Sequence, residues 1–289
     1  MVTVTGSSPL GTAPGRLAPA AGLARGSGLA PGAGLVLGAG LVLGAGLAAG
    51  AYTVLRAAPP GGTARWERVN HRGAPVTLLS GPALALAAGS TSLPAAVAGL
   101  TACAAGVYDD LVGSLGTQAT AKGFRGHLRA LRSGRVTAGV VKVLGIGAGG
   151  CAAVALLPGG RRPVDVLLGG AVVAGSANLL NLLDLRPGRA LKVGLAGALA
   201  LGRAVPAGAA LALLPADLGE RAMLGDAGAN ALGAVLGVAL VERLPSRVAR
   251  GVALVVLAGL TGASEVVSFS RVIDATPVLR GLDRLGRRP

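Results

Sequence analysis

Aromatic and charged residues are both scarce in this chain of 289 residues. One Trp, two Tyr and two Phe leave few rings for stacking on bases, which argues against nucleic-acid binding despite a net charge of +15. Charged residues make up 13% of the chain, whereas a soluble domain carries about 25%. The chain therefore has too few polar groups to cover a water-facing surface. This excludes most soluble enzymes and most disordered proteins.

Cysteine and histidine are rarer still, with two of each. Cys103 and Cys151 both lie in apolar runs, and neither has the spacing of a zinc site or a disulfide framework. His71 and His127 lie in polar stretches, and we interpret both as loop residues. Zinc chemistry and a disulfide-stapled fold are therefore not expected.

Apolar and small residues are abundant instead. Hydrophobic residues make up 52% of the chain, the mean hydropathy is +0.67, and 50 residues are glycine. Small residues at this density are typical of helices that pack closely in lipid. A six-residue near-repeat from Gly32 places glycines four apart, at Gly34 and Gly38 for example, and we interpret it as the packing face of a first spanning helix.

Nine apolar stretches approach the length of about 20 residues that a membrane span needs. The predicted fold is an all-α transmembrane bundle of nine to ten spans. Residues 1–31 are predicted to be a loose Gly/Pro/Ala-rich tail, 32–270 one membrane domain, and 271–289 a basic cytoplasmic tail. The nine predicted spans are 33–55, 76–92, 93–108, 137–157, 164–183, 190–203, 204–216, 227–241 and 249–268.

The distribution of Lys and Arg predicts the orientation, because cytoplasmic loops are enriched in both. With the N-terminus outside and the C-terminus inside, inner segments carry 18 basic residues and outer segments 8. Arg243, Arg247 and Arg250 share one outer loop and count against this orientation. The basic stretch from Trp66 to Pro75 is interpreted as an interface anchor, with a cover over the headgroup side of a site as the alternative.

Half of the twelve acidic residues lie in three predicted inner loops, namely Asp109 and Asp110, Asp184, and Asp217, Glu220 and Asp226. Carboxylates close to basic loops suit Mg²⁺-dependent phosphate chemistry, because Mg²⁺ takes oxygen ligands and basic side chains hold phosphate. An ordinary helix terminus would also explain the Asp pair, and a plain N-cap would explain Asp226.

The segment Asn178-Leu-Leu-Asn181-Leu-Leu-Asp184 places three polar side chains on one helix face. Such groups are costly at the end of a spanning helix unless they have partners. Two interpretations stay open from the residues alone. They form a hydrogen-bonded patch between helices, or they line a pocket for a nucleotide or sugar.

Together and in this order, the three acidic segments resemble the polyprenyl-phosphate glycosyl-1-phosphate transferases. That superfamily includes phospho-N-acetylmuramoyl-pentapeptide transferase and undecaprenyl-phosphate N-acetylglucosamine-1-phosphate transferase. The basic loop from Lys122 to His127 is similar to the family's basic segment after the Asp pair. The matching segments are Asp109-Asp110, Asn178 to Asp184, and Gly225-Asp226-Ala227-Gly228.

The resemblance implies a Mg²⁺-dependent phosphotransferase, with Mn²⁺ as a substitute metal, in a bacterial plasma membrane with its active face in the cytoplasm. Its implied partners are a polyprenyl phosphate such as undecaprenyl phosphate, a UDP-sugar and membrane lipids, and it is compatible with a homodimer. UMP would leave as a lipid-linked sugar diphosphate forms for cell-envelope glycan synthesis. The implied catalytic residues are Asp109, Asp110 and Asp226, the metal ligands Asp226 and Asp110, and the substrate-binding residues Lys122, Asn178, Asn181 and Asp184.

The sequence also departs from the family pattern. Family members commonly continue Asp-Gly-x-Asp-Gly after the Asn segment, whereas Leu185, Arg186 and Pro187 follow Asp184 here, and the family's late His-rich loop is missing. A catalytically degenerate scaffold, or a membrane protein that handles lipids or small molecules, is therefore the alternative. Transport is disfavoured, because polar residues would then be expected near mid-membrane.

Overall fold

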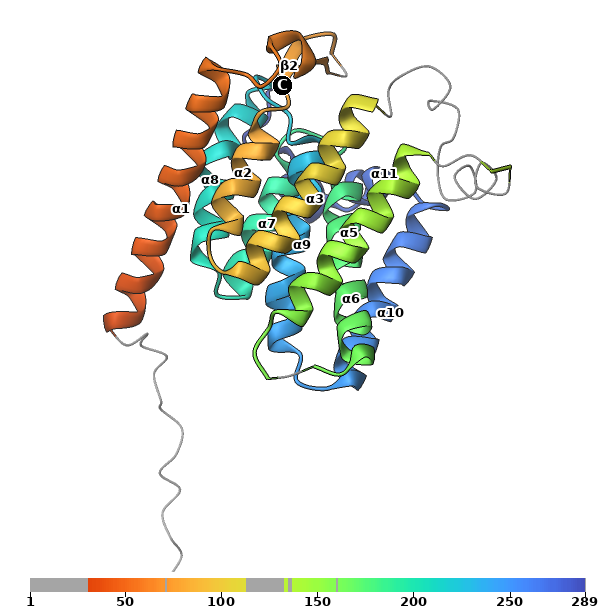
Figure 1. The fold of residues 1–289 in the computed structure, drawn as a ribbon. Helices are drawn as coiled ribbons and strands as arrows, with labels where there is room; N and C mark the ends of the chain where they lie inside the picture. The colour runs from red at the N-terminus through yellow and green to blue at the C-terminus, as the bar shows by residue number, and fades with distance from the viewer. Residues whose placement is uncertain (1–30, 71, 113–132, 135–136, 160, 289) are drawn as a thin grey trace, which may run out of the picture.

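The computed structural model describes residues 31–70, 72–112, 133–134, 137–159 and 161–288, and within these ranges the chain is mostly helical (Figure 1). Each of the nine stretches predicted as a span overlaps a helix, although the stretch 76–92 begins in a strand and contains a helix of ten residues. The helices that form the bundle are α1 (Pro31–Ala57), α2 (Ser80–Gly89), α3 (Leu93–Val112), α5 (Ala138–Ala155), α6 (Pro163–Leu183), α7 (Arg189–Ala200), α8 (Ala204–Leu218), α9 (Gly225–Arg243) and α10 (Arg247–Ser264).

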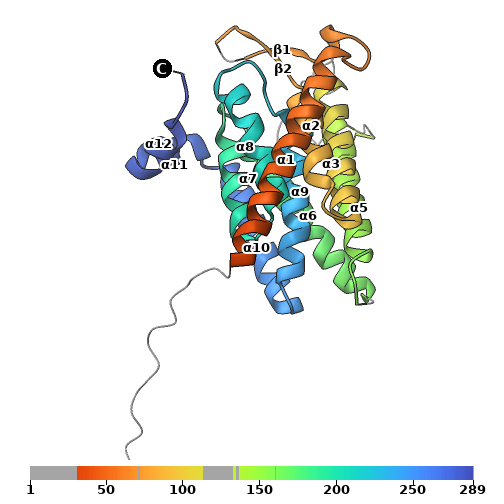
Figure 2. The same cartoon turned by 90° about the vertical axis from the view of Figure 1, so that its left-hand side faces the viewer.

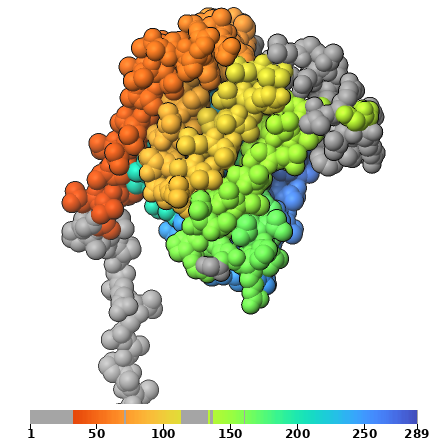
Figure 3. Space-filling model, in the orientation of Figure 1, coloured from red at the N-terminus to blue at the C-terminus, as the bar shows by residue number. Residues whose placement is uncertain are grey.

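Five of the described helices, α1, α3, α5, α6 and α10, are long and apolar enough to cross a membrane. Large apolar side chains on their outer faces are strongly exposed, for example Leu35, Leu144 and Val255. The N-terminal part of α1 stands clear of the rest of the bundle (Figure 3). An apolar surface of this extent is expected where helices meet lipid rather than water. Since α2, α7 and α8 are shorter, the predicted number of spans stays a prediction.

Helix α9 is the central element of the bundle. It packs against α2, α3, α5, α6 and α7, and most of its residues are buried on every side (Figures 1 and 2). A helix that is apolar all round is expected in such a position. Because glycine and alanine make up much of α9, neighbouring helix backbones can approach it closely.

A short hairpin covers one end of the bundle, which we call the hairpin end. Strands β1 (Glu67–Val69) and β2 (Pro75–Thr77) pair antiparallel, with Arg68 opposite Val76. The 3₁₀ turn η1 (Thr63–Arg65) precedes the hairpin. Trp66 is buried against Leu78 and Leu79, so its ring packs inside the protein and does not anchor the interface. For the rest of the stretch to Pro75, the interpretation as an interface anchor stays a prediction. The indole N–H instead donates to the carbonyl oxygen of Pro60 at 2.8 Å, which fixes the turn before the hairpin.

All the described segments predicted to be inner loops meet at the hairpin end. Hydrogen bonds join the hairpin to α3 and to the α8–α9 loop, the α6–α7 loop to α8, and the C-terminal segment to the α6–α7 loop. The pairs are Arg68 with the carbonyl of Asp110, Asn70 with Glu220, Gly188 with Asp217, and Arg287 with the carbonyl of Pro187.

The segment predicted to be a basic tail folds into two further helices, α11 (Phe269–Ala275) and α12 (Pro277–Arg284), which lie beside α7 and α8 (Figure 2). A buried ion pair holds them. The guanidinium group of Arg189 donates to both carboxylate oxygens of Asp283, at 2.8 and 3.0 Å. Lys192 donates to three backbone carbonyls near the end of α12.

The opposite end of the bundle carries the arginines that count against the predicted orientation. Arg247 binds the carboxylate of Asp165 with two hydrogen bonds, of 2.7 and 2.9 Å, and Arg250 lies 3.6 Å from the same carboxylate. Part of this positive charge is therefore neutralised within the protein. The count of basic residues alone overstates the charge at this end.

Candidate functional site

Two carboxylates and an ammonium group meet at the hairpin end. Asp109 lies near the end of α3, Asp226 in the first turn of α9, and Lys142 near the start of α5. The Nζ atom of Lys142 donates to Asp109 Oδ2 at 2.6 Å and also to Asp226 Oδ2. The three side chains keep between 17% and 26% of their surface exposed, so the cluster is partly buried and still reachable. We call Asp109, Lys142 and Asp226 the carboxylate–lysine cluster.

Asp110 has different surroundings from its neighbour Asp109. Its carboxylate accepts hydrogen bonds from the backbone N–H groups of Asp226 and Ala227, at 3.4 and 3.2 Å. These N–H groups begin α9, whose own N-cap residue, Leu224, provides no side-chain acceptor. Asp110 therefore caps a helix from another segment, as a carboxylate at a helix N-terminus is favoured to do. Its predicted role as a metal ligand stays a prediction.

Two glycines allow α3 and the start of α9 to come this close. A Cβ atom at Gly106 would collide with the backbone of Asp226 and Ala227, so only glycine permits the contact. Gly225 has a φ of +64°, a conformation that residues with a Cβ rarely adopt. The Gly-Asp sequence thus turns the chain sharply into α9 and presents Asp226 to the cluster.

The Asn178–Asp184 segment is divided between two roles. Asn178 donates from its side-chain amide to the hydroxyl of Thr261 in α10 at 2.9 Å, which is the interhelical hydrogen bond that the sequence left open. Asn181 is partly buried one turn further along α6. Asp184 ends α6 and lies in the wall of a cavity. The structure therefore separates Asn178 from Asp184, and the substrate-binding roles of all three residues stay predictions.

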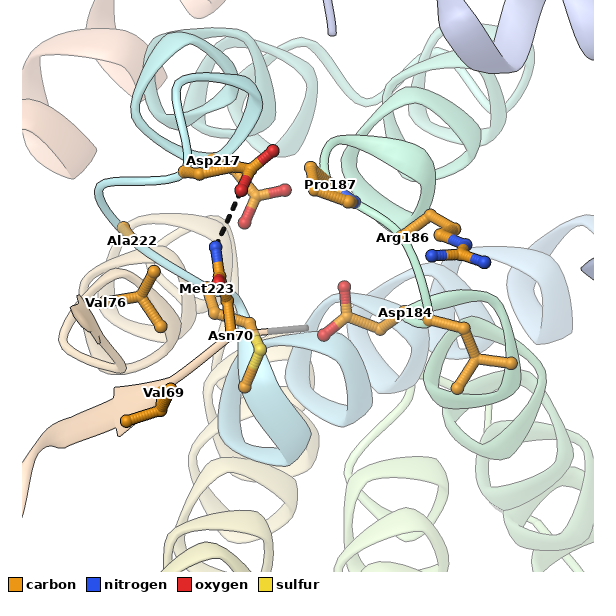
Figure 4. Close-up of a pocket in the computed structure, with 11 residues that line it drawn as sticks. Val69, Asn70, Val76, Asp184, Arg186, Pro187, Asp217, Ala222 and Met223 are labelled. Atoms are coloured by element: carbon orange, nitrogen blue, oxygen red, sulfur yellow. Dashed lines mark hydrogen bonds between the residues drawn. The ribbon is translucent and has the colours of Figure 1, made fainter. Parts of the chain in front are cut away.

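The cavity beside Asp184 has a volume of about 160 Å³. It lies between the α6–α7 loop, the α8–α9 loop and the hairpin, and Asp184 points into it (Figure 4). Asp217 and Glu220 form part of the wall, and the side-chain amide of Asn70 donates to Glu220 at 2.7 Å (Figure 4). We call this the acidic cavity. Pro187 also lines it.

The pKa of Asp184 is raised well above the ordinary value of an aspartate. The main cause is burial, because surrounding protein limits the hydration of this carboxylate even where it faces the cavity. The negative charges of Asp217 and Asp226 add to the effect. Asp184 is therefore held in surroundings that favour a proton, a cation or a hydrogen-bond donor beside it.

The donor set at the hairpin end fits a hard cation. Asp109 and Asp226 already share one positive group, Lys142, and their oxygens are the ligands that Mg²⁺ prefers. Within the described ranges, however, no group of three or more His, Cys, Asp or Glu side chains is arranged to hold a metal ion. A metal here would have to take part of its coordination from water or from a substrate phosphate, as Mg²⁺ usually does.

Sequence reasoning found some of these residues and missed others. Lys142 was not singled out from the sequence, although a single lysine in an apolar run is itself a signal of a partner. Asp217 was counted among the loop acids without a role. Lys122 and the basic loop that extends to His127 lie outside the described residues, so their predicted contact with phosphate stays a prediction.

Comparisons with protein-family models, with curated proteins and with solved structures found no match to this chain.

Proposed function

We propose that this protein is a membrane phosphotransferase that moves a sugar-1-phosphate, such as N-acetylhexosamine-1-phosphate, from a UDP-sugar to a polyprenyl phosphate. The observation that carries the proposal is the meeting of Asp109, Asp226 and Lys142 at the hairpin end, where the acidic cavity also lies. These groups come from three helices that are far apart in sequence, and they are three of the chain's few charged residues. Such convergence in an apolar bundle is typical of a functional site.

The position of the cluster supports a reaction between a lipid and a soluble donor. It lies at the hairpin end, where α3, α5 and α9 reach the loops, rather than in the middle of the bundle (Figure 1). A phosphate on a long lipid can enter there from the bilayer surface, and a nucleotide can enter from water. Phosphoryl transfer depends mainly on positioning and charge neutralisation, which such a site can supply.

In this proposal Asp226, with Asp109 or Asp110, holds Mg²⁺, which would neutralise the phosphate oxygens of the donor. Lys142 then releases one carboxylate and contacts phosphate. Asp110 keeps the N-terminus of α9 in place, so that Asp226 stays aligned with its partners. Asp184 borders the space for the nucleotide or sugar. The predicted bacterial plasma membrane, with this face in the cytoplasm, belongs to the same proposal.

The test is release of UMP by the purified full-length chain with Mg²⁺, undecaprenyl phosphate and a panel of UDP-sugars. We expect release with at least one sugar, and loss of at least about 100-fold in Asp226→Asn, the range typical of one lost electrostatic contact to a transition state. Asp165→Asn at the opposite end is the matched control, and it should retain activity. Silence across the panel from folded protein would reject the proposal.

One observation favours a catalytically degenerate scaffold as a second candidate. Lys142 already satisfies the two carboxylates that a metal would use, so the cluster can serve as a purely structural ion pair. A scaffold predicts that added Mg²⁺ leaves the protein's thermal stability unchanged. It also predicts that Asp226→Asn changes stability only.

A further inference from the structure

A second cavity at the hairpin end, of about 480 Å³, is lined by five arginines, Arg72, Arg186, Arg284, Arg287 and Arg288. They come from the hairpin turn, the α6–α7 loop and the C-terminal segment, which are distant in sequence. Two carboxylates, Glu220 and Asp274, also line it, so positive charge predominates. We call this the arginine cavity.

Three of the five guanidinium groups have no acceptor within the described part of the chain. Arg186, Arg284 and Arg288 form no ion pair or side-chain hydrogen bond with the described residues. Arg72, in contrast, lies 3.4 Å from Glu220. Guanidinium groups gathered around one space repel each other unless an anion lies between them. The cavity therefore has more positive than negative charge. The guanidinium groups of Arg186 and Arg284 can donate hydrogen bonds to an anionic ligand.

The cavity wall is held in place by buried contacts. Arg287 donates to the carbonyl oxygen of Pro187 at 3.0 Å and lies 2.6 Å from Asp283. Asp283 is itself held by both hydrogen bonds from Arg189, which is 3% exposed. Burial, together with the nearby charges of Arg189 and Arg186, lowers the pKa of Arg287 despite its pairing with Asp283. Arg287 is thus fixed in position before any ligand arrives.

We propose that the arginine cavity binds a phosphate-bearing anion. Arginine forms paired hydrogen bonds to phosphate oxygens, and several arginines around one cavity match an anion with more than one negative charge. The anion can be a soluble phosphate compound or the headgroup of an anionic lipid, because the cavity opens at the end of the bundle where loops meet the bilayer surface. The arginine cavity shares Arg186, Pro187 and Glu220 with the acidic cavity, but the proposal does not require the transfer reaction.

The experiment uses pyrophosphate as the probe, titrated into the purified full-length chain in a neutral detergent with a chelator present. Without a divalent metal, the carboxylate–lysine cluster contributes no metal-mediated binding. We expect saturable binding by isothermal titration calorimetry. In Arg186→Gln/Arg284→Gln the affinity should fall by at least about tenfold, which corresponds to one charged hydrogen bond. This variant leaves the described ion pairs intact and should fold.

Matched controls separate the cavity from bulk charge and from the transfer site. Arg162→Gln/Arg243→Gln removes two charges at the opposite end and should bind as the unmodified chain does, as should Asp226→Asn. Absence of saturable pyrophosphate binding to the unmodified chain, both in detergent and in nanodiscs of neutral lipid, would overturn the proposal. An equal loss of pyrophosphate affinity in both double variants would also overturn the proposal, because binding would then depend on the net charge of the protein and not on the cavity.

The source of the anion is tested in nanodiscs. If a lipid headgroup fills the cavity, phosphatidylglycerol should weaken pyrophosphate binding relative to a neutral lipid, and this difference should vanish in Arg186→Gln/Arg284→Gln. If the natural ligand is soluble, the two nanodiscs should bind pyrophosphate equally. Either result identifies the source while supporting the site.

Discussion

At the scale of single residues, the most informative feature is the lysine between two acids. Lys142 lies where two carboxylates converge, and this is also where a bound cation would be placed. A lysine in this position can stabilise the substrate-free protein through its ion pairs. When a substrate is bound, the same lysine can contact its phosphate. The ion pair and the proposed metal site are thus alternative uses of the same carboxylates.

Removing the lysine should reveal whether the carboxylates hold a metal. In Lys142→Met, Asp109 and Asp226 face each other without a cation, and we expect a loss of about 1.5–3 kcal/mol in stability, typical of a charged hydrogen bond. Mg²⁺ should restore thermal stability in this variant more than it stabilises the unmodified chain. The measurement is the melting temperature with and without Mg²⁺.

The control for this comparison is Arg247→Met, which breaks the ion pair with Asp165 at the opposite end. Its melting temperature should fall without recovery in Mg²⁺. If Lys142→Met responds to Mg²⁺ no more than this control does, the cluster holds no metal.

Asp184 should make the stability of the protein depend on pH. The pKa of Asp184 is raised in the folded protein, so its carboxyl group resists ionisation there. In the unfolded chain the same group ionises at the usual aspartate pKa of about 3.9. The stability contributed by the protonated group is complete below that value and is lost as the pH rises towards the folded pKa. Asp184→Asn should therefore stabilise the protein at neutral pH.

The measurement is the melting temperature of both proteins from acidic to neutral pH. The advantage of Asp184→Asn should shrink as the pH falls and vanish where Asp184 is protonated in both states. Asp165→Asn, whose carboxylate is paired with arginine, should show no such advantage at neutral pH. An advantage of Asp184→Asn that is equal at every pH would contradict this account.

At the scale of helices, the site depends on the close approach of α3 and α9. Gly106 lies against the backbone at the start of α9, and a methyl group there must push the helices apart. In Gly106→Ala we expect a loss of about 1–3 kcal/mol, the usual cost of overpacking. The proposed activity should fall as well, because Asp109 and Asp226 move apart. Thermal unfolding and UMP release measure the two effects.

Gly147→Ala in α5 is the matched control, since a Cβ there meets nothing within 4 Å. This change should be neutral or stabilise the helix by up to about 1 kcal/mol, because alanine favours helix over glycine. If both variants behave alike, the contact between α3 and α9 is not tight.

At the scale of the whole molecule, the two ends of the bundle differ in chemistry. The hairpin end carries both cavities, the cluster and most of the described loop arginines, whereas at the opposite end Asp165 neutralises part of the charge. The positive-inside rule therefore favours a cytoplasmic hairpin end.

Labelling of single cysteines tests this orientation in intact bacterial cells. In a chain whose Cys103 and Cys151 are replaced by alanine, an impermeant maleimide should label Arg162→Cys. Glu67→Cys and Arg280→Cys should react only after the membrane is permeabilised. Labelling of Arg280→Cys in intact cells would place the C-terminus outside and reverse the predicted orientation.

Much of the architecture could be predicted from composition and apolar runs. All nine predicted ranges contain a helix, because a stretch of small apolar residues in lipid must satisfy its backbone hydrogen bonds within a helix. The hairpin and the burial of Trp66 could not be predicted, because they depend on packing against α1, α3, the residues just before α2 and the α8–α9 loop. Helices α11 and α12 were missed for the same reason, since a partner as distant as Arg189 holds them in place.

For the site, the residue types could be read directly from the sequence: a few acids and a lysine in a chain with little charge elsewhere. Their partners could not, because these follow from the packing of distant helices. The tertiary structure turned Asp110 towards the backbone of α9, placed Asp109 with Asp226 on Lys142, and assigned Asn178 to α10. Composition indicates whether a segment lies in water or lipid, and periodicity indicates whether it is helical. Which side chains pair between distant helices depends on how the helix backbones pack.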